Sequence, residues 1–72
     1  MSEGIESQVY EFIKNRHTKG DTTASRHVHI RFDIEIAKIE KILNRLLQKG
    51  LVSKLYDKEY QEDRFVPISV KE

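Results

Sequence analysis

The apolar residues between positions 34 and 52 recur at helical spacing and then stop at a glycine, and this pattern constrains the fold most. Its inner positions are Ile36, Ile39, Leu43 and Leu46, widened by Ile42 and Leu47. At about 100° per residue these side chains share one side of a helix. The pattern predicts a helix over residues 35–49, ended by Gly50 in a left-handed conformation. Ile34, just before it, is expected to be the buried plug of a tight turn.

Two further helices are predicted before this one. Residues 3–16 place Ile5, Val9, Phe12 and Ile13 on one stripe of a first helix. A second, short helix is predicted over residues 24–32, with Val28 and Phe32 pointing inward and Thr22 or Thr23 as its N-cap. Asp33 interrupts it and begins the tight turn.

The end of the chain predicts a β-hairpin. Residues 51–56 and 64–70 are typical of strands, and a polar loop over residues 57–63 joins them. Val66, Ile68 and Val70 alternate and are expected on one face. Pro67 lacks a backbone donor and favours an edge strand.

No single element can bury its apolar face alone, so the helices and the hairpin are expected to pack together. The order of elements predicts an α+β fold of one domain over residues 1–72. We expect a winged helix–turn–helix, in which three helices pack on a two-stranded, or three-stranded, antiparallel wing.

Composition excludes several functions. With 72 residues, the chain buries only about 60% of its unfolded surface, which leaves little room for an enclosed active site or a small-molecule substrate. It has no cysteine, no glycine-rich phosphate loop and no catalytic triad pattern. His27 and His29 lie about 200° apart on a helix and cannot share a metal ion. We therefore expect no enzyme activity, no cofactor and no metal.

Location follows from what the sequence lacks. No apolar run reaches the ~20 residues needed to span a bilayer, and the N-terminus does not resemble a signal peptide. The expected location is cytoplasmic, meaning intracellular and associated with the nucleoid, without a membrane partner.

The charge is uneven along the chain. Residues 23–49 carry six basic and three acidic side chains, although the whole chain has a net charge of only +1. An α-helix fits the DNA major groove, and its outer side chains reach phosphates or base edges. The predicted DNA-binding residues are Arg26, Arg31, Lys38, Lys41, Asn44 and Arg45. An ordinary solvated helix face is the alternative, and Glu35 and Glu40 weaken the positive field.

The loop between the strands has the opposite character. Residues 51–63 carry four acidic and two basic side chains, which repel phosphates and suit a basic protein partner or solvent. The predicted partner-binding residues are Tyr56, Asp57, Glu59, Tyr60 and Glu62. We therefore expect weak, unspecific DNA binding combined with a protein surface.

The second and third helices resemble one family in particular. The residues that carry the resemblance are Ser25-Arg26-His27-Val28, Ile34-Glu35-Ile36 and the run from Lys38 to Leu46, supported by Val9–Ile13 and Lys19-Gly20. They resemble the winged helix of the small RNA polymerase III subunit and its archaeal counterpart, the beta subunit of transcription factor E. The resemblance spans residues 6–56. It departs where Thr23-Ala24 replace a tryptophan, where His27 replaces an aspartate, and in the lack of the cysteines that hold an iron–sulfur cluster in many relatives.

This resemblance implies a role in transcription initiation. Members of the family bind the polymerase clamp and promoter DNA, help to open the duplex, and pair with a partner winged-helix protein. The expected partners are therefore double-stranded or melting promoter DNA, bound weakly, and RNA polymerase or a partner initiation factor. Two alternatives remain: a sequence-specific transcriptional regulator acting as a dimer, and a purely protein–protein winged-helix module.

Overall fold

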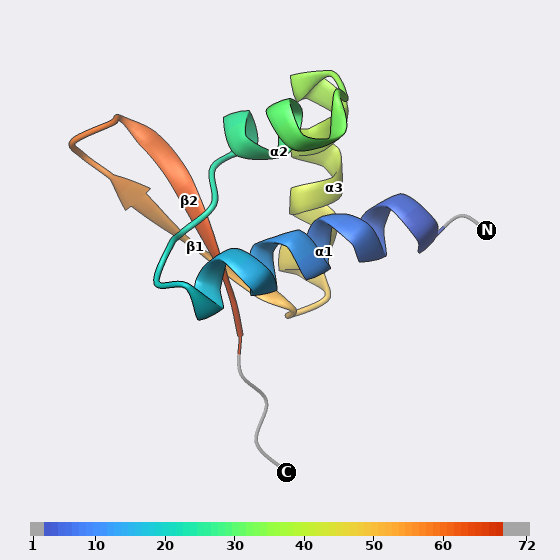
Figure 1. Cartoon of the computed structure of the whole chain (residues 1–72), viewed down its shortest axis with the longest axis horizontal. Helices are drawn as coiled ribbons and strands as arrows, with labels where there is room; N and C mark the ends of the chain where they lie inside the picture. The colour runs from blue at the N-terminus through green and yellow to red at the C-terminus, as the bar shows by residue number, and fades with distance from the viewer. Residues whose placement is uncertain (1–2, 69–72) are drawn as a thin grey trace, which may run out of the picture.

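The computed structural model describes residues 3–68, which form an α+β domain of three helices and a two-stranded antiparallel sheet. The elements are α1 (Glu3–Thr18), α2 (Ser25–Phe32), α3 (Ile36–Gln48), β1 (Val52–Asp57) and β2 (Glu62–Pro67). In Figure 1, α1 crosses α3, α2 lies at one end of α3, and the hairpin projects to the side. The arrangement has the predicted order of elements and is compatible with a winged helix–turn–helix.

Every element contributes to one apolar core. Its buried residues are Val9, Ile13, Val28, Ile39, Ile42, Leu43, Leu46, Val52 and Phe65. The predicted inner stripe of α3 is confirmed at Ile39, Leu43 and Leu46. It is wrong at Ile36, whose side chain is 38% exposed. Side chains in a helix lean toward its N-terminus. Ile36 is the first residue of α3, and its side chain therefore extends past the end of the helix.

The start of α2 differs from the prediction. Neither threonine caps the helix, because the N-cap is Ala24. Thr23 instead forms a β-bridge with Phe65, in which the Thr23 N–H donates to the Phe65 carbonyl at 3.2 Å and the Phe65 N–H donates back at 2.8 Å. This bridge holds Thr23 in an extended conformation and is all that the described residues show of a third strand.

The turn between α2 and α3 depends on Asp33. Its backbone is left-handed, with φ of 58°, and its N–H donates to the His29 carbonyl at 2.8 Å. The Nδ1–H of His29 donates across the turn to the carbonyl of Ile34 at 2.6 Å. Ile34 is only partly buried, so the prediction of a fully buried plug is wrong, and hydrogen bonds close the turn as well.

The hairpin pairs Val52 with Pro67 at its base and Asp57 with Glu62 at its tip. Phe65 faces the core, and Ile68 is 39% exposed. The face that the sequence analysis assigns to Val66 and Ile68 is therefore not the one that packs on the core, and Val70 lies outside the described residues. The core-facing side chains of β2 are offset by one residue from Val66 and Ile68. The bridge to Thr23 brings Phe65 onto the helices, and successive side chains of a strand alternate between its faces.

Candidate nucleic-acid and protein interface

One edge of α3 is basic and exposed. At about 100° per residue, four cationic side chains fall within an arc of about 80°. They are Lys38, Lys41, Arg45 and Lys49. Lys38 and Lys41 are exposed and form no ion pair within residues 3–68. These two ammonium groups are therefore available to an external anion.

The other two cations of this edge are tied to α1. Glu6 of α1 is buried, and it accepts a hydrogen bond of 2.5 Å from the Lys49 ammonium. Its second carboxylate oxygen lies 3.7 Å from the Arg45 guanidinium. The hydrogen bond from Lys49, with the positive charges of both partners, holds the pKa of Glu6 below its ordinary value despite burial. Arg45 nevertheless keeps 72% of its side chain exposed.

The opposite edge of α3 faces an open groove of about 370 Å³ beside the hairpin. The groove is lined by Ser25, Glu40, Leu43, Asn44, Lys54, Glu62, Asp63 and Phe65. Three of these side chains are carboxylates and one is an ammonium. Asn44, predicted to read bases, therefore stands at the border between the basic edge and an acidic groove.

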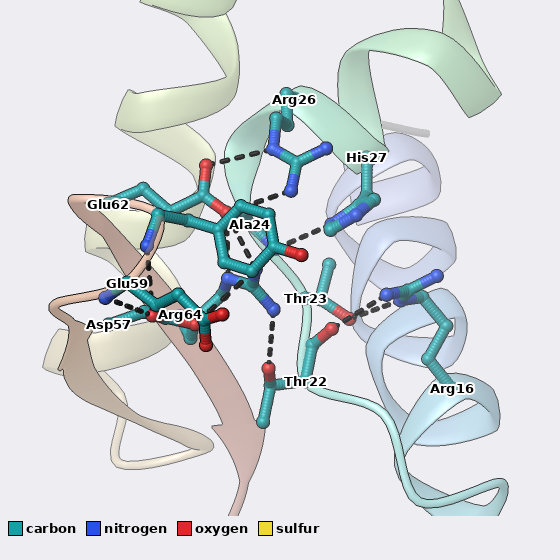
Figure 2. Close-up of polar contacts among 11 residues, drawn as sticks. Arg16, Thr22, Thr23, Ala24, Arg26, His27, Asp57, Glu59, Glu62 and Arg64 are labelled. Atoms are coloured by element: carbon teal, nitrogen blue, oxygen red, sulfur yellow. Dashed lines mark hydrogen bonds and ion pairs between the residues drawn. The ribbon is translucent and has the colours of Figure 1, made fainter.

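The hairpin is fastened to α2 by a network around Glu62 (Figure 2). Arg26 donates two hydrogen bonds to the Glu62 carboxylate, from Nε at 2.8 Å and from Nη2 at 3.0 Å. Arg64 donates to the same carboxylate from Nε at 2.8 Å and to the Thr22 hydroxyl, also at 2.8 Å. The hydrogen bond from Arg26, followed by that from Arg64, lowers the pKa of Glu62.

The hairpin tip is built by three other residues that were predicted to contact a partner. The Asp57 carboxylate accepts the backbone N–H groups of Glu59 and Tyr60 at 2.9 and 3.1 Å, a side-chain turn that aspartate favours. Gln61 completes the loop in a left-handed conformation, with φ of 55°. The centroid of the Tyr60 ring lies close to two guanidinium groups, 5.5 Å from that of Arg26 and 5.2 Å from that of Arg64.

The structure thus divides the predicted partner-binding residues. Tyr56, Glu59 and Tyr60 are exposed, whereas Asp57 and Glu62 are partly buried. Asp57 is bonded within the hairpin, and Glu62 is bonded to α2 and to the hairpin. Arg31 is exposed on α2, where its guanidinium lies 5.0 Å from the centroid of the Phe32 ring. That ring meets Phe12 of α1 edge-on at 5.7 Å.

Two residues that the sequence analysis missed organise this region. Arg64 is mostly buried, with 11% of its side chain exposed, and Glu62 two residues earlier lies on the same face of the strand. That i, i+2 pairing was the signal in the sequence. His27 accepts the Ala24 N–H on its Nδ1 at 2.9 Å and so caps α2. Burial lowers the pKa of His27, and nearby arginines lower it further; these are Arg16, Arg26 and Arg64.

Residues 3–68 contain no group of three or more histidine, aspartate or glutamate side chains placed to hold a metal ion. None of the helices described here combines the length and the apolar character needed to cross a bilayer. The chain matches no protein-family model, no characterised protein and no solved structure at a significant level. The fold and its surface are therefore what indicates the function.

Proposed function

We propose that this chain is a winged-helix module of transcription that binds duplex DNA weakly through the basic edge of α3. The observation that carries the proposal is the pair Lys38 and Lys41, exposed one turn apart on α3 without an acidic partner among residues 3–68. Unpaired ammonium groups on a projecting helix release counterions from DNA when they contact phosphates. In the proposed complex, Arg45 adds a third contact from its exposed side.

The acidic groove supports low sequence specificity. Glu40 and Glu62 line the same groove as Asn44, so in the free protein their charges oppose a phosphate backbone on the hairpin side of α3. A helix that approaches DNA by one edge makes more phosphate than base contacts, and phosphate contacts carry no sequence information. This arrangement favours a general initiation module over a sequence-specific dimeric regulator.

A titration of a fluorescent 20-base-pair duplex tests the DNA contact. We expect binding at low salt with a log–log salt slope of roughly −2 to −3, the value for two or three neutralised phosphates. The variant Lys38→Glu/Lys41→Glu should lose DNA affinity by a factor of at least about ten. The matched control is Lys14→Glu/Lys19→Glu, which makes the same change in charge on α1 and just after it. Equal losses in both variants, or no binding by the unmodified protein, would refute the proposal.

The same titration separates the general module from the regulator. Two duplexes of unrelated sequence should bind within about threefold of each other, since a mismatch in a specific site costs about 1–3 kcal/mol per base pair. A preference of a hundredfold or more for one duplex would instead identify a sequence-specific regulator.

A protein partner is the second candidate function, and the exposed aromatic side chains beside the acidic groove favour it. Tyr56 and Tyr60 are each about 60% exposed at the outer half of the hairpin. We propose that this surface contacts RNA polymerase or a partner initiation factor. A photo-crosslinking amino acid at position 56 should capture one of these proteins in native extract, and the same group at His17 on α1 should not. Equal capture from both positions would count against the hairpin surface.

A further inference from the structure

The contact between Arg26 and Glu62 has the geometry of a guanidinium bound to a phosphate. Two N–H groups of Arg26 donate in parallel to the two oxygens of one carboxylate, at 2.8 and 3.0 Å. Arginine binds phosphate oxygens through the same paired donors. About half of the Arg26 side chain is exposed, so an external anion can approach the position that Glu62 holds.

Arg64 makes this position a site for an anion in its own right. Its guanidinium contacts the same Glu62 carboxylate, and it keeps a hydrogen bond to Thr22 and an ion pair with Asp57 at 3.5 Å. Arg64 therefore stays in place without Glu62. Arg26, by contrast, has Glu62 as its one acidic partner among residues 3–68. In Figure 2 the two guanidinium groups approach Glu62 from α2 and from the hairpin.

The site adjoins the surface proposed to meet DNA. Ser25, the neighbour of Arg26, lines the same groove as Glu62 and Asn44 of α3. The pKa of Glu62 is lowered and that of Arg26 is raised, in each case chiefly by their mutual hydrogen bond. Both groups thus stay charged at neutral pH, and another anion must displace Glu62 for Arg26 to be released.

We infer that Arg26 and Arg64 form a phosphate-binding subsite that Glu62 occupies in the free protein and a DNA backbone phosphate occupies in the complex. The inference rests on the proposed DNA binding and deepens it by adding a second contact region outside α3. Glu62 then acts as an internal competitor that weakens binding, and removing its charge should strengthen binding.

Glu62→Gln tests the inference against Glu59→Gln as a matched control. Both variants remove one negative charge from the hairpin, but the Glu59 side chain is exposed and forms none of the ion pairs described. With the fluorescent duplex, Glu62→Gln should bind about three- to tenfold more tightly than Glu59→Gln. Its salt slope should be steeper by about one, because the phosphate contact no longer displaces a carboxylate that takes up a counterion in solvent. Arg26→Gln/Glu62→Gln should lose the gain.

The outcomes separate this inference from the proposed function. Equal affinities for the two single variants would overturn the subsite, while binding that still depends on Lys38 and Lys41 would leave the α3 contact intact. If neither the unmodified protein nor Glu62→Gln binds DNA, both fail.

A measurement on the unmodified protein keeps the test valid even if Glu62→Gln does not fold. The Arg26 Nε–H resonance should shift during a DNA titration, while that of Arg16, bonded to the Thr23 hydroxyl at 3.0 Å, stays in place. An Arg26 resonance that does not move at DNA saturation would overturn the inference.

Discussion

His27 shows how a single side chain can take a role that the local sequence assigns to others. Threonines precede the helix and are common N-caps, but Thr23 uses its backbone to pair with Phe65. The N-cap then falls on Ala24, which has no side-chain acceptor of its own. His27, three residues on, accepts the Ala24 N–H from within the helix, the reciprocal bond that glutamate or glutamine makes in a capping box. Only the tertiary bridge, which no local pattern shows, decides between these arrangements.

The cap makes the stability of the domain depend on pH. Nδ1 of His27 accepts a hydrogen bond only when the ring is neutral, and burial with the surrounding positive charge lowers the pKa of the ring from its ordinary 6.5. The unfolded chain therefore binds the proton more readily. The contribution of His27 is complete above about pH 6.5 and is lost as the pH falls from there through the folded pKa.

We accordingly expect the midpoint of urea unfolding to decrease between pH 7.5 and 5. Glu6 and Glu62 have lowered pKa values, and their contributions are lost only below about 4.5, outside this window. His27→Gln should flatten the profile, since glutamine can accept the same bond without titrating. His17→Gln, an exposed histidine on α1, should leave the decrease unchanged. If the decrease of the urea midpoint persists in His27→Gln, a group other than His27 causes it.

The charged residues of the hairpin show the limit of sequence patterns at this scale. The sequence shows that residues 57–63 are acidic, but it does not show which of these carboxylates form hydrogen bonds or ion pairs within the fold. Asp57 and Glu62 stand on either side of the loop and face Arg64 or backbone N–H groups. Glu59 sits at the tip and is exposed. Pairing across the chain, as between Arg26 and Glu62, needs three-dimensional placement.

At the scale of elements, periodic patterns located all three helices and both strands. The predicted bounds of the third helix, 35–49, differ from Ile36–Gln48 by one residue at each end. The errors lie where an element meets a neighbour from another part of the sequence. The alternation places Val66 and Ile68 together on one face of β2, but only the bridge at Phe65 shows that the other face packs on the core. Alternation alone gives two equivalent faces.

The turn between α2 and α3 sets the angle of the proposed DNA-binding helix, and it offers a test on one backbone position. Asp33 has φ of 58°, where a Cβ is disfavoured and glycine is free of strain. Asp33→Gly should be neutral or stabilise the fold by up to about 1 kcal/mol. Asp33→Val should destabilise it by about 1–2 kcal/mol, because a β-branched side chain crowds the left-handed conformation. Urea unfolding measures both.

Asp21 provides the control for this pair, since it is also an exposed loop aspartate but its φ is not positive. Asp21→Val should change the free energy of unfolding by no more than about 0.5 kcal/mol. If Val is tolerated equally well at both positions, the left-handed backbone at Asp33 does not constrain the turn.

For the molecule as a whole, the residues that stabilise the fold lie in the core, and the residues proposed to bind DNA or a partner lie on the surface. The basic edge of α3, the acidic groove and the hairpin tip all surround a core to which every element contributes. A domain of this size is stabilised by only about 5–15 kcal/mol, so the core has little reserve. Charge changes at Lys38 and Lys41 leave the core packing intact, which is why they can test binding without unfolding the protein.

The continuity of the core predicts that the domain unfolds as one unit. Leu46 lies on α3 with 1% of its surface exposed, and Leu46→Ala should lower the free energy of unfolding by about 2–5 kcal/mol. Leu55→Ala on the outer hairpin, where 45% of the residue is exposed, should change it by about 0.5 kcal/mol or less. In both variants the amide resonances of α1 and of β2 should disappear at the same urea concentration, because neither element has a core without the other. If β2 were lost from Leu46→Ala before α1, the hairpin would be a separate unit, and the network around Glu62 could open without unfolding the helices.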